Sequence, residues 1–243
     1  MDNCMKKQIF TWILPLLGLS SCRAELLDYG AGSVRVEIER GEAWLHDFPL
    51  FWGIEKKNAP QIAVWIESPD GEYLGTVYVS HKIATESWQA ARGARRPEAL
   101  PHWCHSRGVR YEDGLYLPTK RHPLADGISG ATPRESFSLK VVPGEGLRRF
   151  VVKVEVNHST DFNDAWPRNA RPGEPGYSGG KEGSGQPAVV YAAGIDPDAG
   201  VREAEAVPVG HSSADGSTGE LNPDLSQLTS ALRIVRRITV KVL

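Results

Sequence analysis

Apolar and polar residues alternate along several short segments of the chain, which is the pattern of β-strands that bury one face. In the first of them, Val34, Val36 and Ile38 alternate with charged residues. The predicted strands cover residues 33–40, 62–66, 73–79, 137–142, 150–156, 188–193 and 232–242. Helical periodicity is almost absent, and the one helix that we predict covers residues 85–92, with Thr85 as its N-cap.

Two long connections interrupt the predicted strands, one over residues 81–133 and the other over residues 157–187. Connections of this length in a compact domain are usually either functional or disordered. The chain contains 25 Gly and 17 Pro, which favours turn-rich β structure. We therefore predict a mainly β fold, an immunoglobulin-like β-sandwich with two long loop insertions.

The N-terminal segment has the layout of an export signal. Lys6 and Lys7 precede a mostly apolar run over residues 9–19, which is too short to span a bilayer as a helix. The following Leu19-Ser20-Ser21-Cys22 resembles the lipobox of bacterial lipoproteins. That resemblance implies removal of residues 1–21 and acylation of Cys22, so that the membrane becomes a partner through the lipid. An ordinary cleaved signal that ends near a cysteine is the alternative.

The lipoprotein interpretation also predicts the domain organisation. Residues 1–21 would be the signal peptide, residues 22–32 a tether, and residues 33–243 a single β-sandwich domain. Position 23 is Arg and not Asp, so the common inner-membrane retention signal of such lipoproteins is absent. This favours an extracytoplasmic location at the outer membrane or the cell surface.

The net charge and the number of cysteines argue against two classes of protein, nucleic-acid-binding proteins and small disulfide-rich proteins. The 28 basic and 30 acidic residues give a formal charge of −2, which gives no support to nucleic-acid binding. Three cysteines cannot form a dense disulfide framework. With residues 1–21 removed and Cys22 lipidated, Cys104 has no intramolecular partner. It is then either a buried apolar thiol, which is the commoner case, or a free one.

One motif in the first long connection suggests a cofactor. The segment Asp126-Gly127-Ile128-Ser129-Gly130-Ala131-Thr132 resembles the D-x-x-[S/T]-G-A-T flavinylation motif of FMN-binding domains, such as those of sodium-pumping quinone reductases and Rnf-type complexes. In those families an extracytoplasmic flavin transferase joins the FMN phosphate to the last Thr through a phosphoester. The resemblance implies covalent FMN on Thr132, with a flavin transferase and a membrane redox partner.

The residue types of the motif suit this chemistry. Gly130 permits a tight turn, and Ala131 is too small to block a bulky nucleotide. Thr132 would present the nucleophilic hydroxyl, and Asp126 could orient a hydroxyl or a divalent ion. Ser129 occupies the hydroxyl position of the motif. The alternative is a plain capping turn over residues 132–135, with Thr at the N-cap and Glu three positions later.

A looser resemblance covers most of the predicted domain. Residues 61–67, 70–76, 129–132 and 151–156 resemble a family of predicted periplasmic proteins of unknown function. That family is thought to be similar to the immunoglobulin-like part of flagellar hook-capping proteins, and some members occur together with flavin transferases. The family has no established activity, so the resemblance supports the fold more than the function.

Two further groups of residues are weak candidates for metal sites. His102, Cys104 and His105 are ligand types that suit Zn²⁺ or copper, but their spacing matches no metal motif, and a surface loop with incidental histidines is favoured. Oxygen ligands over Asp161, Asn163 and Asp164 could hold Ca²⁺, although local Asx hydrogen bonding explains them more simply. Four aromatic residues in the long connections could stack on a flavin or a sugar, or cover the end of the sandwich: Trp88, Trp103, Trp166 and Tyr177.

Two functions from different classes therefore remain. In the first, the protein is a lipid-anchored electron carrier with FMN on Thr132, and it is not an enzyme in its own right. In the second, it is a non-catalytic, immunoglobulin-like binding or assembly module of the cell envelope, without a cofactor. No Ser-His-Asp set, paired-carboxylate motif or phosphate-binding glycine loop stands out in the sequence.

Overall fold

The computed structural model describes residues 27–29, 33–49, 55–88, 95–125, 127–143 and 147–243. The predicted signal peptide, Cys22 and Asp126 lie outside the described residues. Within the described ranges, the helices are all too short to cross a membrane.

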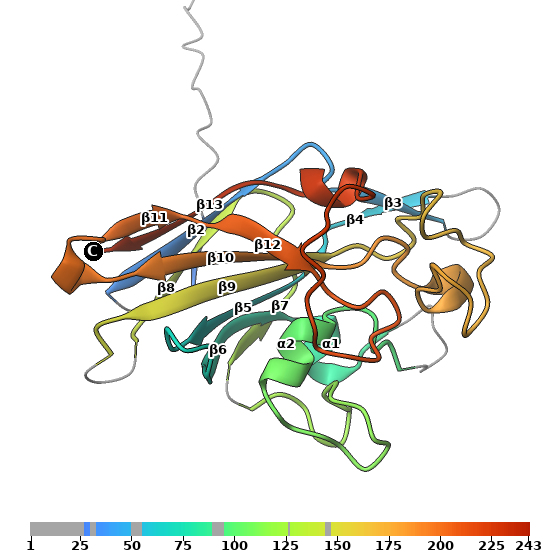
Figure 1. Ribbon diagram of the computed structural model, residues 1–243, viewed down its shortest axis with the longest axis horizontal. Coiled ribbons are helices and arrows are strands. Elements are labelled where there is room, and N and C mark those ends of the chain that lie inside the picture. Colours follow the sequence, from blue (N-terminus) through green and yellow to red (C-terminus); the bar gives the residue numbers. More distant parts are fainter. Residues whose placement is uncertain (1–26, 30–32, 50–54, 89–94, 126, 144–146) are drawn as a thin grey trace, which may run out of the picture.

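The described strands form two sheets and a separate hairpin (Figure 1). One sheet has the order β1 (Leu27–Tyr29), β8 (Phe137–Val141), β2 (Val34–Arg40), β13 (Val235–Val242) and β11 (Glu203–Glu205). The other has the order β12 (Val207–His211), β10 (Val189–Ile195), β9 (Phe150–Asn157), β5 (Gln61–Glu67), β6 (Tyr73–Ser80) and β7 (Ile128–Gly130). We call them the five-stranded and the six-stranded sheet. β3 (His46–Pro49) and β4 (Glu55–Asn58) form the hairpin.

The order of the strands in the two sheets matches that of an immunoglobulin-like sandwich. In the six-stranded sheet, the antiparallel run β10-β9-β5-β6 follows the order G-F-C-C′ of immunoglobulin domains, and the antiparallel pair β8-β2 follows E-B. β13 lies antiparallel to β2, at the position where strand A of such domains would lie. The prediction of a mainly β sandwich is confirmed.

All seven predicted strands are present, with small shifts at their ends. The last begins at Val235 and not at residue 232, because residues 230–233 form a 3₁₀ turn (η3, Ser230–Arg233). Several short strands were not predicted, and one of them, β1, takes residues 27–29 of the predicted tether into the five-stranded sheet beside β8.

The predicted helix over residues 85–92 is wrong where the structure describes it. A helix, α1 (His81–Thr85), ends at Thr85, and the Thr85 hydroxyl donates back to the carbonyl of His81 at 2.7 Å. Glu86 then has a φ of 53°, a left-handed conformation that stops the helix. A second helix, α2 (Pro101–Ser106), begins with proline, whose missing N–H costs nothing at that position.

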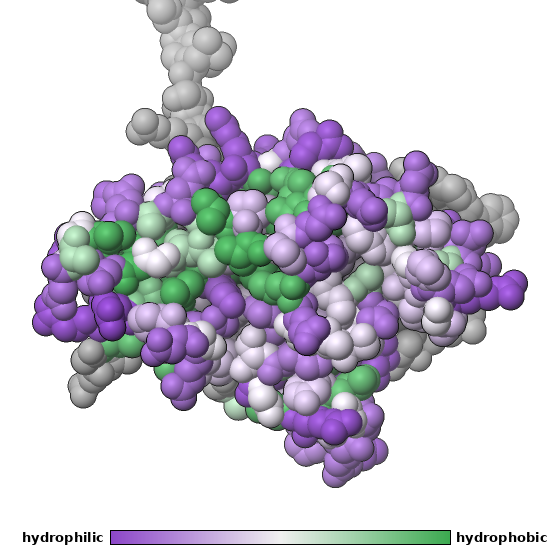
Figure 2. All heavy atoms as spheres, in the orientation of Figure 1, coloured by the Kyte–Doolittle hydropathy of each residue, from purple (hydrophilic) through white to green (hydrophobic). Residues whose placement is uncertain are grey.

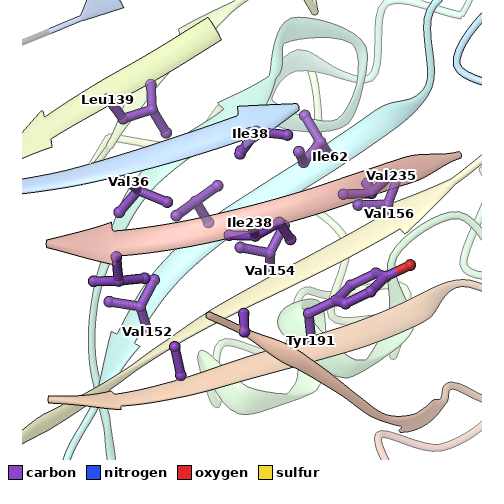
Figure 3. Packing of buried hydrophobic residues seen from close by; sticks show 14 of the residues in the cluster. Val36, Ile38, Ile62, Leu139, Val152, Val154, Val156, Tyr191, Val235 and Ile238 are labelled. Carbon is purple, nitrogen blue, oxygen red and sulfur yellow. The ribbon is translucent and has the colours of Figure 1, made fainter. Parts of the chain in front are cut away.

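The six-stranded sheet is buried on both of its faces. Its inner face packs against the five-stranded sheet, where Ile62 of β5 lies beside Ile38 of β2 and Val154 of β9 lies beside Ile238 of β13 (Figure 3). Its outer face packs against α1 and α2 through a second core that includes Trp65 and Trp103. Every residue of β5 is consequently buried, which explains why residues 62–66 are apolar on both faces.

One edge of the sandwich leaves apolar side chains in solvent. Val207 and Val209 of the edge strand β12 are 58% and 36% exposed. Figure 2 shows apolar residues gathered across the middle of this face, in the region of β10 and β12. Pro208 between the two valines has no N–H, which limits edge-to-edge pairing by this strand.

A pair of histidines beside β3 predicts acid sensitivity. His158 is 4% exposed, donates through Nε2 to the carbonyl of Ala43 at 2.9 Å, and lies 5.1 Å from the ring of His46. Burial lowers the pKa of His158 to about 3. The unfolded chain binds a proton near pH 6.5 and the folded protein does not, so stability is lost as the pH falls below about 6.5.

We expect His158→Gln, whose amide can still donate to Ala43, to remove that part of the pH dependence. Between about pH 6.5 and pH 5 the wild type should lose about 2 kcal/mol more unfolding free energy than the variant. Urea unfolding of both proteins across this range measures the difference. Parallel pH profiles would show that His158 is not held neutral in the fold.

Candidate functional site

The residues of the flavinylation-like motif lie at the edge of the six-stranded sheet. Ile128–Gly130 form β7, which runs parallel to the end of β6 and pairs Ser80 with Gly130. The Tyr78 hydroxyl donates to the Gly130 carbonyl at 3.0 Å. A Cβ on Gly127 would come within 2.8 Å of the Thr76 side chain, so that glycine permits a close approach of the two strands. Residues 128–130 of the motif are therefore part of the sheet and not of a free loop.

Thr132 is half-buried and is held by a chain of hydrogen bonds. Its Oγ1 lies 2.7 Å from Oγ of Ser80. Oγ of Ser80 also accepts from the backbone N–H of Ile62 at 2.8 Å and donates to the Ile62 carbonyl at 3.3 Å. Either hydroxyl can be the donor in the bond between Ser80 and Thr132. Oγ1 of Thr132 is thus held, through Ser80, against buried backbone of β5.

The residues on either side of Thr132 differ in exposure. Ser129 and Ala131 are exposed, whereas Pro133 is buried and its carbonyl accepts from Nε1 of Trp44 at 3.0 Å. The chain is therefore exposed to solvent just before Thr132, and just after it the chain is buried and bonded to the sandwich. The alternative of a capping turn is wrong, because no helix follows and residues 133–136 lead directly into β8.

The hydrogen-bond partners of Thr132 have a chemical consequence. In the described part of the chain, no carboxylate or imidazole hydrogen-bonds to the hydroxyl of Thr132 or of Ser80. The described residues therefore place no base beside the Thr132 hydroxyl. Asp126, the acidic residue of the motif, lies outside the described residues.

The histidines and cysteine of the first metal candidate lie on α2 and not in a surface loop. Nδ1 of His102 donates to the Gly219 carbonyl at 2.7 Å, which leaves Nε2 to accept from Nζ of Lys153 at 3.1 Å. Cys104 is 3% exposed and free, and burial raises the pKa of its thiol. Nδ1 of His105 lies 2.8 Å from the Pro101 carbonyl. The expectation of incidental histidines in a surface loop was therefore wrong.

The oxygen ligands of the second candidate do not share one use: Asn163 is bonded within its own loop, and Asp161 is bonded to Ser230 of η3. Asn163 Oδ1 accepts from the backbone N–H groups of Ala165 and Trp166, as in an Asx turn. Oδ1 of Asp161 accepts from the Ser230 hydroxyl at 2.6 Å, while Asp164 is exposed. Among the described residues, no group of three or more His, Cys, Asp or Glu is placed to hold a metal ion.

The aromatic residues of the long connections are mostly in the cores. Trp103 is fully buried in α2, and Trp88 and Trp166 are each 8% exposed, so these rings cover the sandwich; Tyr177 is half-buried. A cavity of about 490 Å³ lies beside α2, between residues 104–117 and 216–220. Residues 127–132 of the motif do not line this cavity.

Two features of the molecule had no signal in the sequence. Ser80, the partner of Thr132, is a serine at the end of an apolar strand. Glu155 is a fully buried carboxylate on the outer face of β9, and it accepts from the backbone N–H groups of His102 and Trp103 at 3.2 and 2.7 Å. It satisfies two of the unpaired donors in the first turn of α2.

No protein-family model, curated protein or solved structure matches this chain.

Proposed function

We propose that the protein is a lipid-anchored, extracytoplasmic electron carrier that holds FMN through a phosphoester on Thr132. The observation that carries the proposal is the position of the Thr132 hydroxyl. It is fixed by Ser80 at the edge of a sheet, directly after the exposed residues Ser129 and Ala131. A modifying enzyme can approach an acceptor at such an edge, and the hydroxyl is held in one place for it.

The transfer needs an activated flavin phosphate, which is a phosphoanhydride donor supplied with the transferase. The Thr132 oxygen bonds to phosphorus, the bond from phosphorus to the anhydride oxygen breaks, and the hydroxyl proton passes to a base of the transferase. FMN, once attached, supplies the redox chemistry. This chain contributes the acceptor oxygen of Thr132 and holds it in place through the hydrogen bond to Ser80.

The test is co-expression of the full-length chain with a flavin transferase that modifies a known acceptor domain in the same cells. We expect the wild type to carry a fluorescent flavin that survives denaturing electrophoresis, and Thr132→Ala to carry none. Thr132→Ser keeps a hydroxyl and should keep most of the flavin, while Thr239→Ala in β13 is a remote control that should be fully modified. An unmodified wild type, or a fluorescent Thr132→Ala variant, would refute the proposal.

The second candidate, a binding or assembly module without a cofactor, has one observation in its favour. The exposed valines of β12 provide an apolar edge of the kind found at protein interfaces. Under this alternative, replacing Val207 and Val209 by lysine should abolish association with the partner, while Thr132→Ala should have no effect. A pull-down from envelope extracts with both variants separates the two functions.

A further inference from the structure

Positively charged side chains gather around the ring of Trp88, beyond the end of α1. Nζ of Lys82 lies 6.0 Å from the centroid of the indole ring, and the guanidinium carbon of Arg96 lies 4.7 Å from it. The charge of Lys56, from β4, also acts on Lys82. We call Lys56, Lys82, Trp88 and Arg96 the Trp88 cluster.

The Trp88 cluster has more positive charge than its partners neutralise. Nε of Arg96 donates to Glu98 Oε1 at 2.8 Å, which pairs one cation with one carboxylate. Within the described ranges, neither Lys56 nor Lys82 lies within ion-pair distance of a carboxylate. Burial, together with the charges of Lys56 and Arg96, lowers the pKa of Lys82. The folded protein therefore holds the unmatched cation of Lys82 beside Trp88, and the charge of Lys56 acts on it.

Two buried donors of the same cluster have no acceptor. Arg96 is 5% exposed, and its Nη1 donates to the Ser159 hydroxyl at 2.7 Å, but its Nη2 has no hydrogen-bond partner. Nε1 of Trp88 is likewise buried without a partner. Leaving a buried donor unpaired costs about 1–3 kcal/mol, and more for a charged group. Two such donors beside unmatched cations call for an acceptor that carries negative charge.

The place of the cluster in the fold is well defined. Lys82 lies two residues beyond Ser80, the last residue of β6, and Arg96 is bonded to Ser159 just beyond the end of β9. Trp88 packs with α1 against the outer face of the six-stranded sheet. Thr132, in contrast, is followed by Pro133, which is bonded into the inner core through Trp44. The cluster shares no residue with the motif, although α1, which carries Lys82, contacts β7 of the motif.

We propose that the Trp88 cluster is a binding site for an oxyanion, and that its ligand carries a phosphate group. A phosphate presents several acceptor oxygens at once, so it can take the free N–H of Arg96 and the N–H of Trp88 while Lys82 and Lys56 balance its charge. Arg96 is already oriented by Glu98 and Ser159, so little rotamer entropy is lost on binding. The proposal does not depend on flavin at Thr132.

The test uses the full-length Thr132→Ala protein, in which no flavin can be attached. Inorganic phosphate and glycerol 3-phosphate are titrated separately by calorimetry at constant ionic strength, which distinguishes the free ion from a phosphate ester. We expect a Kd of about 1 mM or tighter for at least one of them. Adding Lys82→Ala should weaken binding at least tenfold, and Trp88→Phe, which keeps a ring without its N–H, should weaken it severalfold.

The matched control is the neighbouring lysine, Lys57. Its Nζ lies 3.6 Å from Asp47 and its side chain is exposed, so Lys57→Ala should bind phosphate like the parent protein. Without phosphate, Lys82→Ala should melt at the same or a higher temperature than the parent, since it removes repulsion. Phosphate should raise the melting temperature of the parent but not of Lys82→Ala. Absence of binding by the parent, or equal losses in the Lys57 and Lys82 variants, would overturn the proposal.

Discussion

Replacing Trp103 by alanine is expected to lower the free energy of unfolding by about 3–5 kcal/mol. The indole is fully buried between α2 and the six-stranded sheet, and its Nε1 donates to the Thr76 hydroxyl at 3.0 Å. The guanidinium of Arg107 lies over the ring, 5.1 Å from its centroid. The substitution opens a large cavity in the outer core and removes one of the two hydrogen bonds of the Thr76 hydroxyl, whose bond to the Tyr73 hydroxyl at 2.6 Å remains. A loss of this size is a large part of the stability of an ordinary domain.

Chemical denaturation monitored by circular dichroism measures this loss. Trp103→Phe fills most of the cavity and removes only the hydrogen bond and part of the ring, so it should cost less than half as much as Trp103→Ala. A loss below about 1 kcal/mol for Trp103→Ala would mean that α2 contributes little to the stability of the sandwich.

Replacing Glu155 by alanine is expected to cost about 3–5 kcal/mol as well, for a different reason. The carboxylate accepts the backbone N–H groups of His102 and Trp103, which have no other acceptor at the start of α2 once it is removed. Two buried donors and a small cavity then remain in the outer core. Glu37→Gln on β2 is the matched control: its half-exposed pair with Arg35, at 3.6 Å, should contribute less than about 1 kcal/mol.

The isosteric variant Glu155→Gln separates the charge of Glu155 from its hydrogen bonds. Burial raises the pKa of Glu155 to about 7, so the folded protein keeps a proton that the unfolded chain releases near pH 4.5. Stability contributed by this group is therefore complete below about pH 4.5 and is lost as the pH rises toward 7. Glu155→Gln should lack this decline. Identical pH profiles for the two proteins would show that the carboxylate is already ionised in the fold.

The long strands could be predicted because those with one face on the inner core alternate, as β2 does, and because β5, which is buried on both faces, is a continuous apolar run. The short strands could not, because they lie at edges and carry exposed or charged residues: β4 is Glu-Lys-Lys-Asn, and β12 contains Pro208. α2 was missed for another reason. It has only six residues and buries the adjacent Trp103 and Cys104, so it is too short to show a helical period.

Only the part of the candidate site that lies in one short stretch of the chain could be predicted from the sequence. A short motif singled out Thr132, but Ser80, which holds its hydroxyl, lies 52 residues away and belongs to no pattern. The Trp88 cluster combines residues from β4, α1 and the segments after it, and no regular spacing relates them. Both sets of residues are brought together by the packing of segments that are far apart in the sequence, so they can be recognised only when the fold is known.

The pairing of β13 with β2 also affects the order in which the protein can fold. It joins segments far apart along the chain: Nε of Arg237 donates to Glu39 across 198 residues. Until β13 pairs with β2, one edge of β2 has no hydrogen-bond partner and the inner core lacks the side chains of β13. Pairings between segments so far apart along the chain slow folding. In a nascent chain, β2 therefore keeps this edge open until residues 235–242 have been made. That is the state in which a protein exported as we propose can be threaded across a membrane.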